Sequence, residues 1–141
     1  MNRNSYKPSM ANINQEHTKG IDVADSFRLY CGEEYKHIDF IENRNEENDL
    51  LISTELKRVV GNVESIIDWV ELRHGDGIET SVQEVVDSFR TYYSKESNHI
   101  NTMARDGDES DKIIAREISR VIDNIDRICR IAECYAEKNG Y

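Results

Sequence analysis

The chain has 141 residues, 38% of them hydrophobic, so it can bury the core of one small domain. One proline and seven glycines leave long uninterrupted stretches, a composition that disfavours a turn-rich all-β fold and favours helices. No apolar run approaches the roughly 20 residues that cross a bilayer, and no signal-peptide pattern opens the sequence, so we expect a cytoplasmic protein without a membrane partner.

The formal net charge is -10, which disfavours direct binding to nucleic acid and favours a basic protein partner. The charge is uneven along the chain. Residues 20–73 carry 13 acids against six bases, a net charge of -7, whereas residues 110–141 carry six of each. We therefore expect an acidic surface over the earlier part of the fold.

The N-terminal segment, residues 1–19, is rich in Asn, Ser and Lys and contains Pro8, which predicts a flexible tail ahead of one domain over residues 20–141. That domain contains a tandem repeat. A shift of 62 positions aligns residues 23–74 with 85–136 without a gap, and 18 of the 52 pairs are identical, where chance gives about three or four. The repeats span about residues 21–74 and 82–138.

Each repeat divides into two helices by the spacing of its apolar residues, which recur every three or four positions. The first repeat has one such ladder at Val23, Phe27, Tyr30, Glu34, His37 and Ile41 and another at Ile52, Leu56, Val59, Val63, Ile66 and Val70. The second repeat has the same ladders at Val85, Phe89, Tyr92, Glu96, His99 and Met103 and at Ile114, Ile118, Val121, Ile125, Ile128 and Ala132.

Polar stretches at residues 43–48 and 105–110 separate the two helices of each repeat. Between the repeats, the segment from Ser81 to Glu84 has the form of a capping box that starts a helix. A lone helical hairpin leaves its apolar faces uncovered, so two hairpins should pack together. The prediction is an all-α, antiparallel four-helix bundle with a pseudo-twofold axis.

The three cysteines, Cys31, Cys129 and Cys134, are odd in number and show no C-x-x-C spacing. This pattern argues against a disulfide framework and against a structural zinc site. We expect reduced cysteines, most of them packed in the fold.

Glu34 and His37, with their copies Glu96 and His99, stand on ladder steps that a bundle usually fills with Leu or Ile. Buried carboxylate and imidazole groups need a partner, a metal or an open cavity. Counting residues from each hairpin turn places Glu55 and Glu117 at the level of the two histidines. The six side chains match the ligand inventory of di-iron carboxylate bundles, so one hypothesis is a transition-metal site for iron or manganese. The Glu-x-x-His motif lies on the first helix of each hairpin rather than the second, so the similarity is one of inventory and not of family.

A second hypothesis is a structural polar network. The same counting places Arg58 at the level of Glu34, and Arg120 at the level of Glu96, so each arginine would pair with the carboxylate of its own hairpin while Glu55 holds His37. In a third hypothesis these two arginines, with Arg28 and Arg90, line a pocket for a small anion or nucleotide.

The sequence contains no glycine-rich phosphate loop and no nucleophile elbow, which favours a non-enzymatic protein. The leading prediction is a small acidic interaction module, an inhibitor or adaptor that docks on a basic or apolar surface of a protein partner. The metal-binding bundle and the bundle with an anion pocket are the alternatives. The fold is also compatible with a homodimer.

Overall fold

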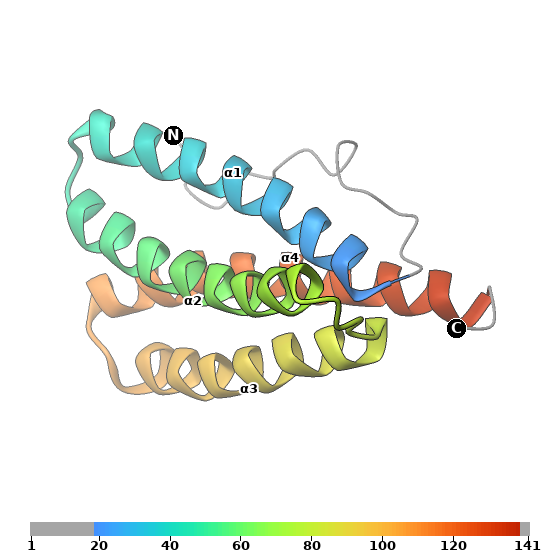
Figure 1. The fold of residues 1–141 in the computed structure, drawn as a ribbon. Coiled ribbons are helices and arrows are strands. Elements are labelled where there is room, and N and C mark those ends of the chain that lie inside the picture. The colour runs from blue at the N-terminus through green and yellow to red at the C-terminus, as the bar shows by residue number, and fades with distance from the viewer. Residues whose placement is uncertain (1–18, 139–141) are drawn as a thin grey trace.

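The computed structural model describes residues 19–138, which form four helices joined by two short turns and a longer linker (Figure 1). The helices are α1 (Gly20–Arg44), α2 (Asp49–Gly75), α3 (Val82–Asp106) and α4 (Glu109–Lys138). The described residues contain no strand, so the predicted all-helical class is confirmed. The predicted tail falls almost entirely outside the described residues. Within residues 19–138, no helix combines the length and apolar character needed to cross a membrane.

The two hairpin turns lie in the polar stretches that the sequence predicted. After α1, Asn45 adopts a left-handed conformation with φ 56°, which asparagine tolerates better than most residues. The carboxylate of Asp49 accepts hydrogen bonds from the Glu46 amide and from the Arg44 guanidinium, each at 2.7 Å. In the second turn, a Cβ added to Gly107 would lie 2.5 Å from a backbone carbonyl oxygen, so the chain path there requires glycine.

The linker between the hairpins is held at its C-terminal end. Ser81 caps α3 as the sequence predicted, because its hydroxyl accepts a hydrogen bond of 3.1 Å from the Glu84 amide. The Thr80 carbonyl accepts a 2.8 Å hydrogen bond from the amide of Gly20, where a Cβ would lie only 2.3 Å from that oxygen. The linker is therefore fixed against the first residue of α1.

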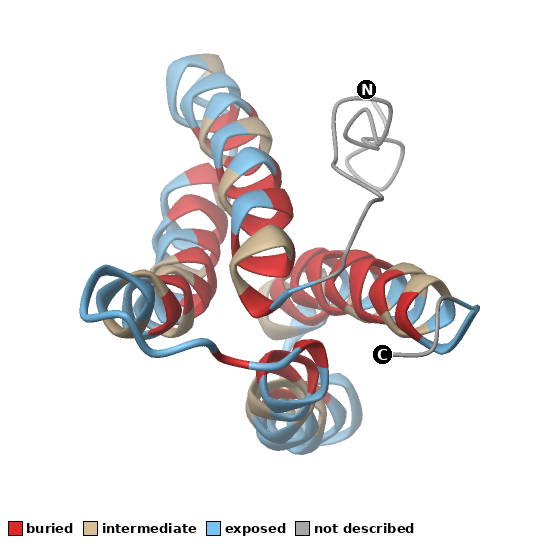
Figure 2. Ribbon diagram, turned by 45° about the vertical axis from the view of Figure 1, so that its right-hand side comes forward, coloured by how far each residue is buried: buried red, intermediate tan, exposed pale blue. Residues whose placement is uncertain are grey.

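The hairpins α1–α2 and α3–α4 pack against each other, and each helix of one hairpin contacts both helices of the other. Both turns lie at the same end of the molecule (Figure 1). The buried residues occupy the faces where the helices meet (Figure 2). At the centre, Phe27 of α1 stacks on Phe89 of α3 with ring centroids 3.8 Å apart. Near the turns, the Ser110 hydroxyl donates to the Asn48 amide oxygen at 2.8 Å. Both contacts join residues 62 positions apart.

Most predicted ladder positions are buried. On α1 and α4 every step of the six-residue ladders is buried, and on α2 only Ile66 is half-buried. Helix α3 departs from the prediction, since Tyr92 and Met103 are half-buried and His99 is exposed. The prediction that His99 lies on the core face is wrong because α3 is covered over a narrower stripe than α1, with six buried residues against eleven.

Two of the three cysteines are buried, as expected for packed thiols. Burial raises the pKa of the Cys31 and Cys129 thiols to about 12, which keeps them protonated and unreactive. Cys134 on α4 is exposed. All three thiols are free.

The stacked phenylalanines provide a test of how the hairpins pack. Phe27→Ala should lower the free energy of unfolding by about 3–5 kcal/mol, because it removes a fully buried ring and leaves a cavity. Phe89→Ala should have a similar cost, and the double variant should lose less than the sum because the rings touch. Denaturant titration followed by circular dichroism measures these losses. Leu50→Ala, at a side chain that is 77% exposed, is the control and should change stability by less than about 0.5 kcal/mol. Strict additivity of the two phenylalanine losses would contradict the observed stack.

Candidate functional site

A buried polar cluster, here called cluster 1, joins α1 to α4. The Glu34 carboxylate, which is fully buried, accepts two hydrogen bonds from the Arg120 guanidinium at 2.6 and 3.0 Å. It also accepts a 2.8 Å hydrogen bond from the Tyr30 hydroxyl, which in turn accepts one of 3.2 Å from the Asn124 side-chain amide. Burial raises the pKa of Tyr30 well above its ordinary value, so this hydroxyl stays a donor.

The equivalent residues of the other repeat form cluster 2, which joins α3 to α2. The Glu96 carboxylate accepts hydrogen bonds of 2.5 and 3.1 Å from Arg58 and one of 3.3 Å from Tyr92. The Asn62 amide donates to the Tyr92 hydroxyl at 3.3 Å. Every one of these contacts has its counterpart in cluster 1 at positions 62 residues away.

Both clusters connect one hairpin to the other, which differs from the predicted polar network. Glu34 pairs with Arg120 and not with Arg58, the partner predicted inside its own hairpin. Counting from the turn correctly sets the level of an arginine along the hairpin. However, Arg58 and Arg120 lie at the same level in two equivalent hairpins, and only the rotation of each helix decides which of them faces the carboxylate.

The predicted pair of His37 with Glu55 is replaced by a contact of His37 with the other hairpin. The buried His37 Nε2 lies 3.9 Å from the Glu117 carboxylate of α4, and Arg120 Nε lies 3.5 Å from the same carboxylate. Glu55, the predicted partner of His37, instead accepts a 2.7 Å hydrogen bond from Arg58. Cluster 1 is the more buried of the two clusters, because the Arg120 side chain is 12% exposed whereas the Arg58 side chain of cluster 2 is 38% exposed.

The arrangement does not fit a two-metal carboxylate centre. The six proposed ligands fall into two groups, and a guanidinium lies against a carboxylate in each group. The six proposed metal ligands are Glu34, His37, Glu55, Glu96, His99 and Glu117. Within residues 19–138, no three His, Cys, Asp or Glu side chains converge in a way that could hold a metal ion. An arginine guanidinium in contact with a carboxylate opposes the binding of a metal cation to that carboxylate. The clusters therefore have the chemistry of ion-paired networks.

The four arginines proposed for an anion pocket all face carboxylates. Arg28 contacts Asp68 at 2.8 Å and Glu71 at 2.5 Å, both on α2. Arg90 makes a bidentate contact with Glu133 of α4, with both distances at 2.5 Å. Because Arg58 and Arg120 are bound in the clusters, the four guanidinium groups do not converge on a shared pocket. The Arg28–Glu71 and Arg90–Glu133 pairs again occupy equivalent positions of the repeats.

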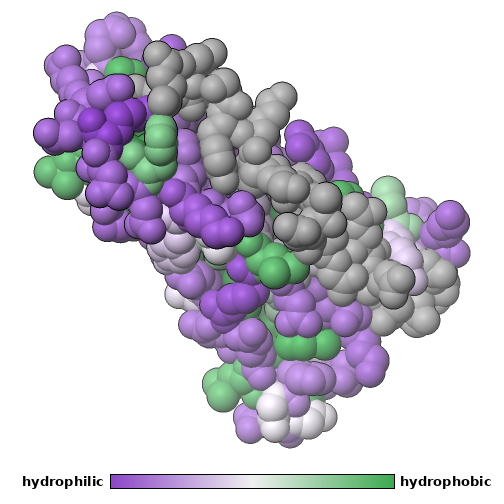
Figure 3. All heavy atoms as spheres, turned by 90° about the horizontal axis from the view of Figure 1, so that it is seen from above, coloured by the Kyte–Doolittle hydropathy of each residue, from purple (hydrophilic) through white to green (hydrophobic). Residues whose placement is uncertain are grey.

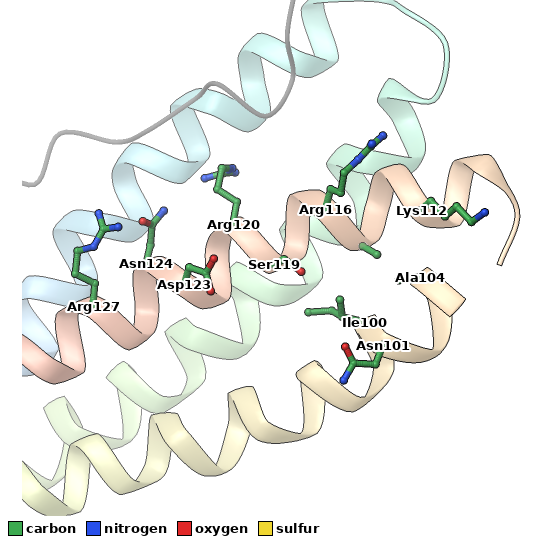
Figure 4. Close-up of a pocket in the computed structure, with 11 residues that line it drawn as sticks. Ile100, Asn101, Ala104, Lys112, Arg116, Ser119, Arg120, Asp123, Asn124 and Arg127 are labelled. Carbon is green, nitrogen blue, oxygen red and sulfur yellow. The ribbon is translucent and has the colours of Figure 1, made fainter. Parts of the chain in front are cut away.

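Two surface hollows were not anticipated from the sequence. One, of about 560 Å³, runs along α4 beside the end of α3. Figure 4 shows the basic side chains that line it from α4, which are Lys112, Arg116, Arg120 and Arg127. The other, of about 520 Å³, lies at the α1–α2 turn and includes Leu50 and Leu51. The spacing of Lys112 and Arg116, four residues apart on one helical face, was a signal for the first hollow. The exposed leucines at the start of α2 were a signal for the second.

Removal of the cluster 1 guanidinium should be strongly destabilising. Arg120→Ala leaves the buried Glu34 carboxylate without its cation and should lower the free energy of unfolding by about 3–5 kcal/mol. Arg58→Ala should cost less, because Arg58 is more exposed and water can reach Glu96. Denaturant titration of the two variants tests this order. Glu34→Gln combined with Arg120→Met should recover part of the loss, and equal losses for the two arginine variants would contradict the difference in burial.

Cluster 2, the more exposed cluster, should make the stability of the fold depend on pH. Burial by itself would raise the pKa of Glu96, but the Arg58 guanidinium outweighs burial and holds the pKa below its usual range. The ionised pair therefore stabilises the folded chain above the unfolded-state pKa of about 4.3, and this contribution is lost as the pH falls through the lower folded-state pKa. Between about pH 5 and pH 3, the free energy of unfolding of the wild type should fall more steeply than that of Glu96→Gln. Glu137→Gln, on the exposed end of α4, is the control and should follow the wild-type curve.

Comparison with models of protein families gave no match for this chain. Searches of curated proteins and of solved structures also returned no match.

Proposed function

We propose that this chain is a non-enzymatic interaction module, an inhibitor or adaptor that docks on a protein partner with a basic and apolar surface. The docking face is the turn end of the first hairpin, here called the turn surface. It comprises Phe40, Glu42, Glu46, Leu50 and Leu51.

The observation that carries the proposal is the distribution of exposed apolar side chains. Among residues 19–138, all seven large hydrophobic residues that are exposed lie between positions 29 and 78. They are Leu29, Phe40, Leu50, Leu51, Trp69, Leu72 and Ile78. The face seen in Figure 3 is predominantly hydrophilic and carries separate hydrophobic patches. Three of the seven, Phe40, Leu50 and Leu51, lie near the turn between α1 and α2. Exposed apolar residues with a polar surround are typical of protein-binding surfaces.

The turn surface combines apolar and acidic groups around a hollow of about 520 Å³. Leu50 is 77% exposed and Leu51 is 51% exposed, and both line the hollow with Glu42 and Glu46. Phe40 lies on the last turns of α1 and is 47% exposed, with the Arg44 guanidinium 5.6 Å from its ring centroid. Glu42 is ion-paired with Lys57, which also lines the hollow, and Glu46 lies 3.4 Å from the Arg44 guanidinium. The hollow itself therefore offers mainly the apolar surface of its leucines to an anchor side chain of the partner.

The other repeat lacks this combination at the equivalent positions. Thr102 takes the place of Phe40, Ala104 that of Glu42, and Lys112 that of Leu50. The core ladders of the two repeats stay similar, so the fold does not require leucine or phenylalanine at these surface positions. The difference supports a role of the turn surface outside folding.

The charge of the first hairpin supports the choice of a basic partner. Residues 20–73 carry a net charge of -7, which attracts a positively charged surface and repels nucleic acid and anionic lipid. Exposed charges of this kind mainly raise the association rate, and their effect declines as salt screens them. The apolar side chains would then supply most of the contact that holds the complex.

A double substitution tests the turn surface. Phe40→Thr with Leu50→Lys removes two exposed apolar side chains and adds one positive charge, so it should weaken binding to the partner by at least about tenfold. The partner is first identified by affinity capture with the full chain, and binding of the purified partner is then measured by calorimetry at low and physiological salt.

Thr102→Lys is the matched control, because it adds the same charge at the Phe40 position of the other repeat. This control should bind within about twofold of the wild type. Circular dichroism should show that both variants keep the helical fold. Binding that is unchanged in the double variant, or that is indifferent to salt, would contradict the proposal.

A further inference from the structure

We infer that the chain has a second docking surface of opposite charge, a groove along α4 that takes an acidic amphipathic helix of a protein partner. This groove, here called the α4 groove, has a volume of about 560 Å³. Its cations are Lys112, Arg116, Arg120 and Arg127, and Ile100, Asn101 and Ala104 border it from α3 (Figure 4). The inference goes beyond the proposed function and uses different residues.

The cations of the α4 groove are available to a ligand in different degrees. Arg120 is held by Glu34, and Lys112 lies 3.9 Å from Glu109 at the start of the helix. Arg116 and Arg127 are exposed, and neither is paired with a carboxylate in the part of the chain that the structure describes. In a chain with a net charge of -10, most arginines are neutralised by neighbouring acids. Two unneutralised guanidinium groups along one groove therefore attract an anionic partner.

The length of the groove favours an extended ligand over a small anion. Lys112 and Arg127 are 15 residues apart on α4, which corresponds to about 22 Å at 1.5 Å per residue. A single phosphate or carboxylate reaches only neighbouring cations. A helix of about 15 residues spans the whole row and can place one acid on each helical turn.

The apolar floor of the α4 groove and the hollow beside it favour an amphipathic helix over a phosphate polymer as the ligand. Ile100, Ala104 and Ala115 supply apolar surface with small side chains, which allow a helix backbone to approach closely. A third hollow, of about 360 Å³, shares Arg127 with the α4 groove and adds Ile131 and Tyr135. These apolar groups match the apolar stripe of an amphipathic helix.

One carboxylate in the α4 groove also distinguishes the two ligand classes. Asp123 lies in the row between Arg116 and Arg127 and is exposed. It would repel the uniform charge of a phosphate backbone. A peptide can place a neutral or basic side chain opposite it.

The α4 groove, like the turn surface, is specific to one repeat. The positions of Arg116 and Arg127 correspond to Thr54 and Ser65 on α2, and Lys112 corresponds to Leu50. Replacing each α4 residue by its α2 counterpart should leave the fold intact, because the first hairpin already carries that residue at the equivalent position. Arg116→Thr with Arg127→Ser removes both unneutralised guanidinium groups without touching cluster 1.

The probe is a fluorescein-labelled peptide of about 16 residues, designed as a helix with leucine on one face and glutamate on its flanks. Fluorescence anisotropy with the full chain should show saturable binding that weakens as salt is raised. Arg116→Thr with Arg127→Ser should weaken this binding by about tenfold or more. Lys95→Thr with Arg105→Ser removes the same charge from α3 outside the groove and should leave binding within about twofold.

Three further outcomes decide the ligand class. A peptide of the same composition in scrambled order, without an apolar face, should bind at least about tenfold more weakly, and equal binding would overturn the amphipathic fit. Inorganic polyphosphate or a single-stranded oligonucleotide that binds while the peptide does not would also overturn the inference. Phe40→Thr with Leu50→Lys should keep full peptide binding, so a failure of the turn surface and a failure of the α4 groove are distinguishable.

Discussion

The packing of the four helices depends on two buried carboxylates that are neutralised from the opposite hairpin. Glu34 meets Arg120, and Glu96 meets Arg58, in each case through two hydrogen bonds. A carboxylate in an apolar interface is very unfavourable without such a partner, so neither hairpin can bury its own glutamate alone. A shift of one hairpin by a single helical turn would separate both pairs. The polar pairs thus select one register from the many that apolar side chains would tolerate.

The two halves keep the same core while their surfaces differ. Equivalent tyrosine, asparagine and arginine contacts recur in both clusters, and the Arg28–Glu71 pair has its copy in Arg90–Glu133. Outside the core, the first hairpin carries exposed leucine and phenylalanine among acids, and α4 carries the basic groove. Since packing fixes the shared contacts, the differences at the surface are where a role in binding can develop. The two proposed surfaces would let one small bundle contact partners of opposite charge.

The sequence predicts the helices and most of the core because apolar spacing depends only on neighbours along the chain. It also predicts that Glu34 lies on the core face and needs a partner, a metal or an open cavity. It does not decide between Arg58 and Arg120, since the repeat places both at one level and the choice depends on how the helices turn about their axes. The exposure of His99 could not be predicted for a related reason, because the packing of the other hairpin against α3 decides which residues of α3 are buried. The α4 groove was missed because its wall combines residues from two helices.

The reciprocal form of the cluster contacts has a consequence for how far the two halves can differ. In an isologous dimer, residue i of one subunit contacts residue j of the other, and j contacts i across the same axis. The Glu34–Arg120 and Glu96–Arg58 pairs have this form, as does the stack of Phe27 on Phe89. Two identical hairpins that pair across a twofold axis would make contacts of this form. Because both halves here lie in one chain, each can carry different surface residues at equivalent positions, which two identical subunits could not do.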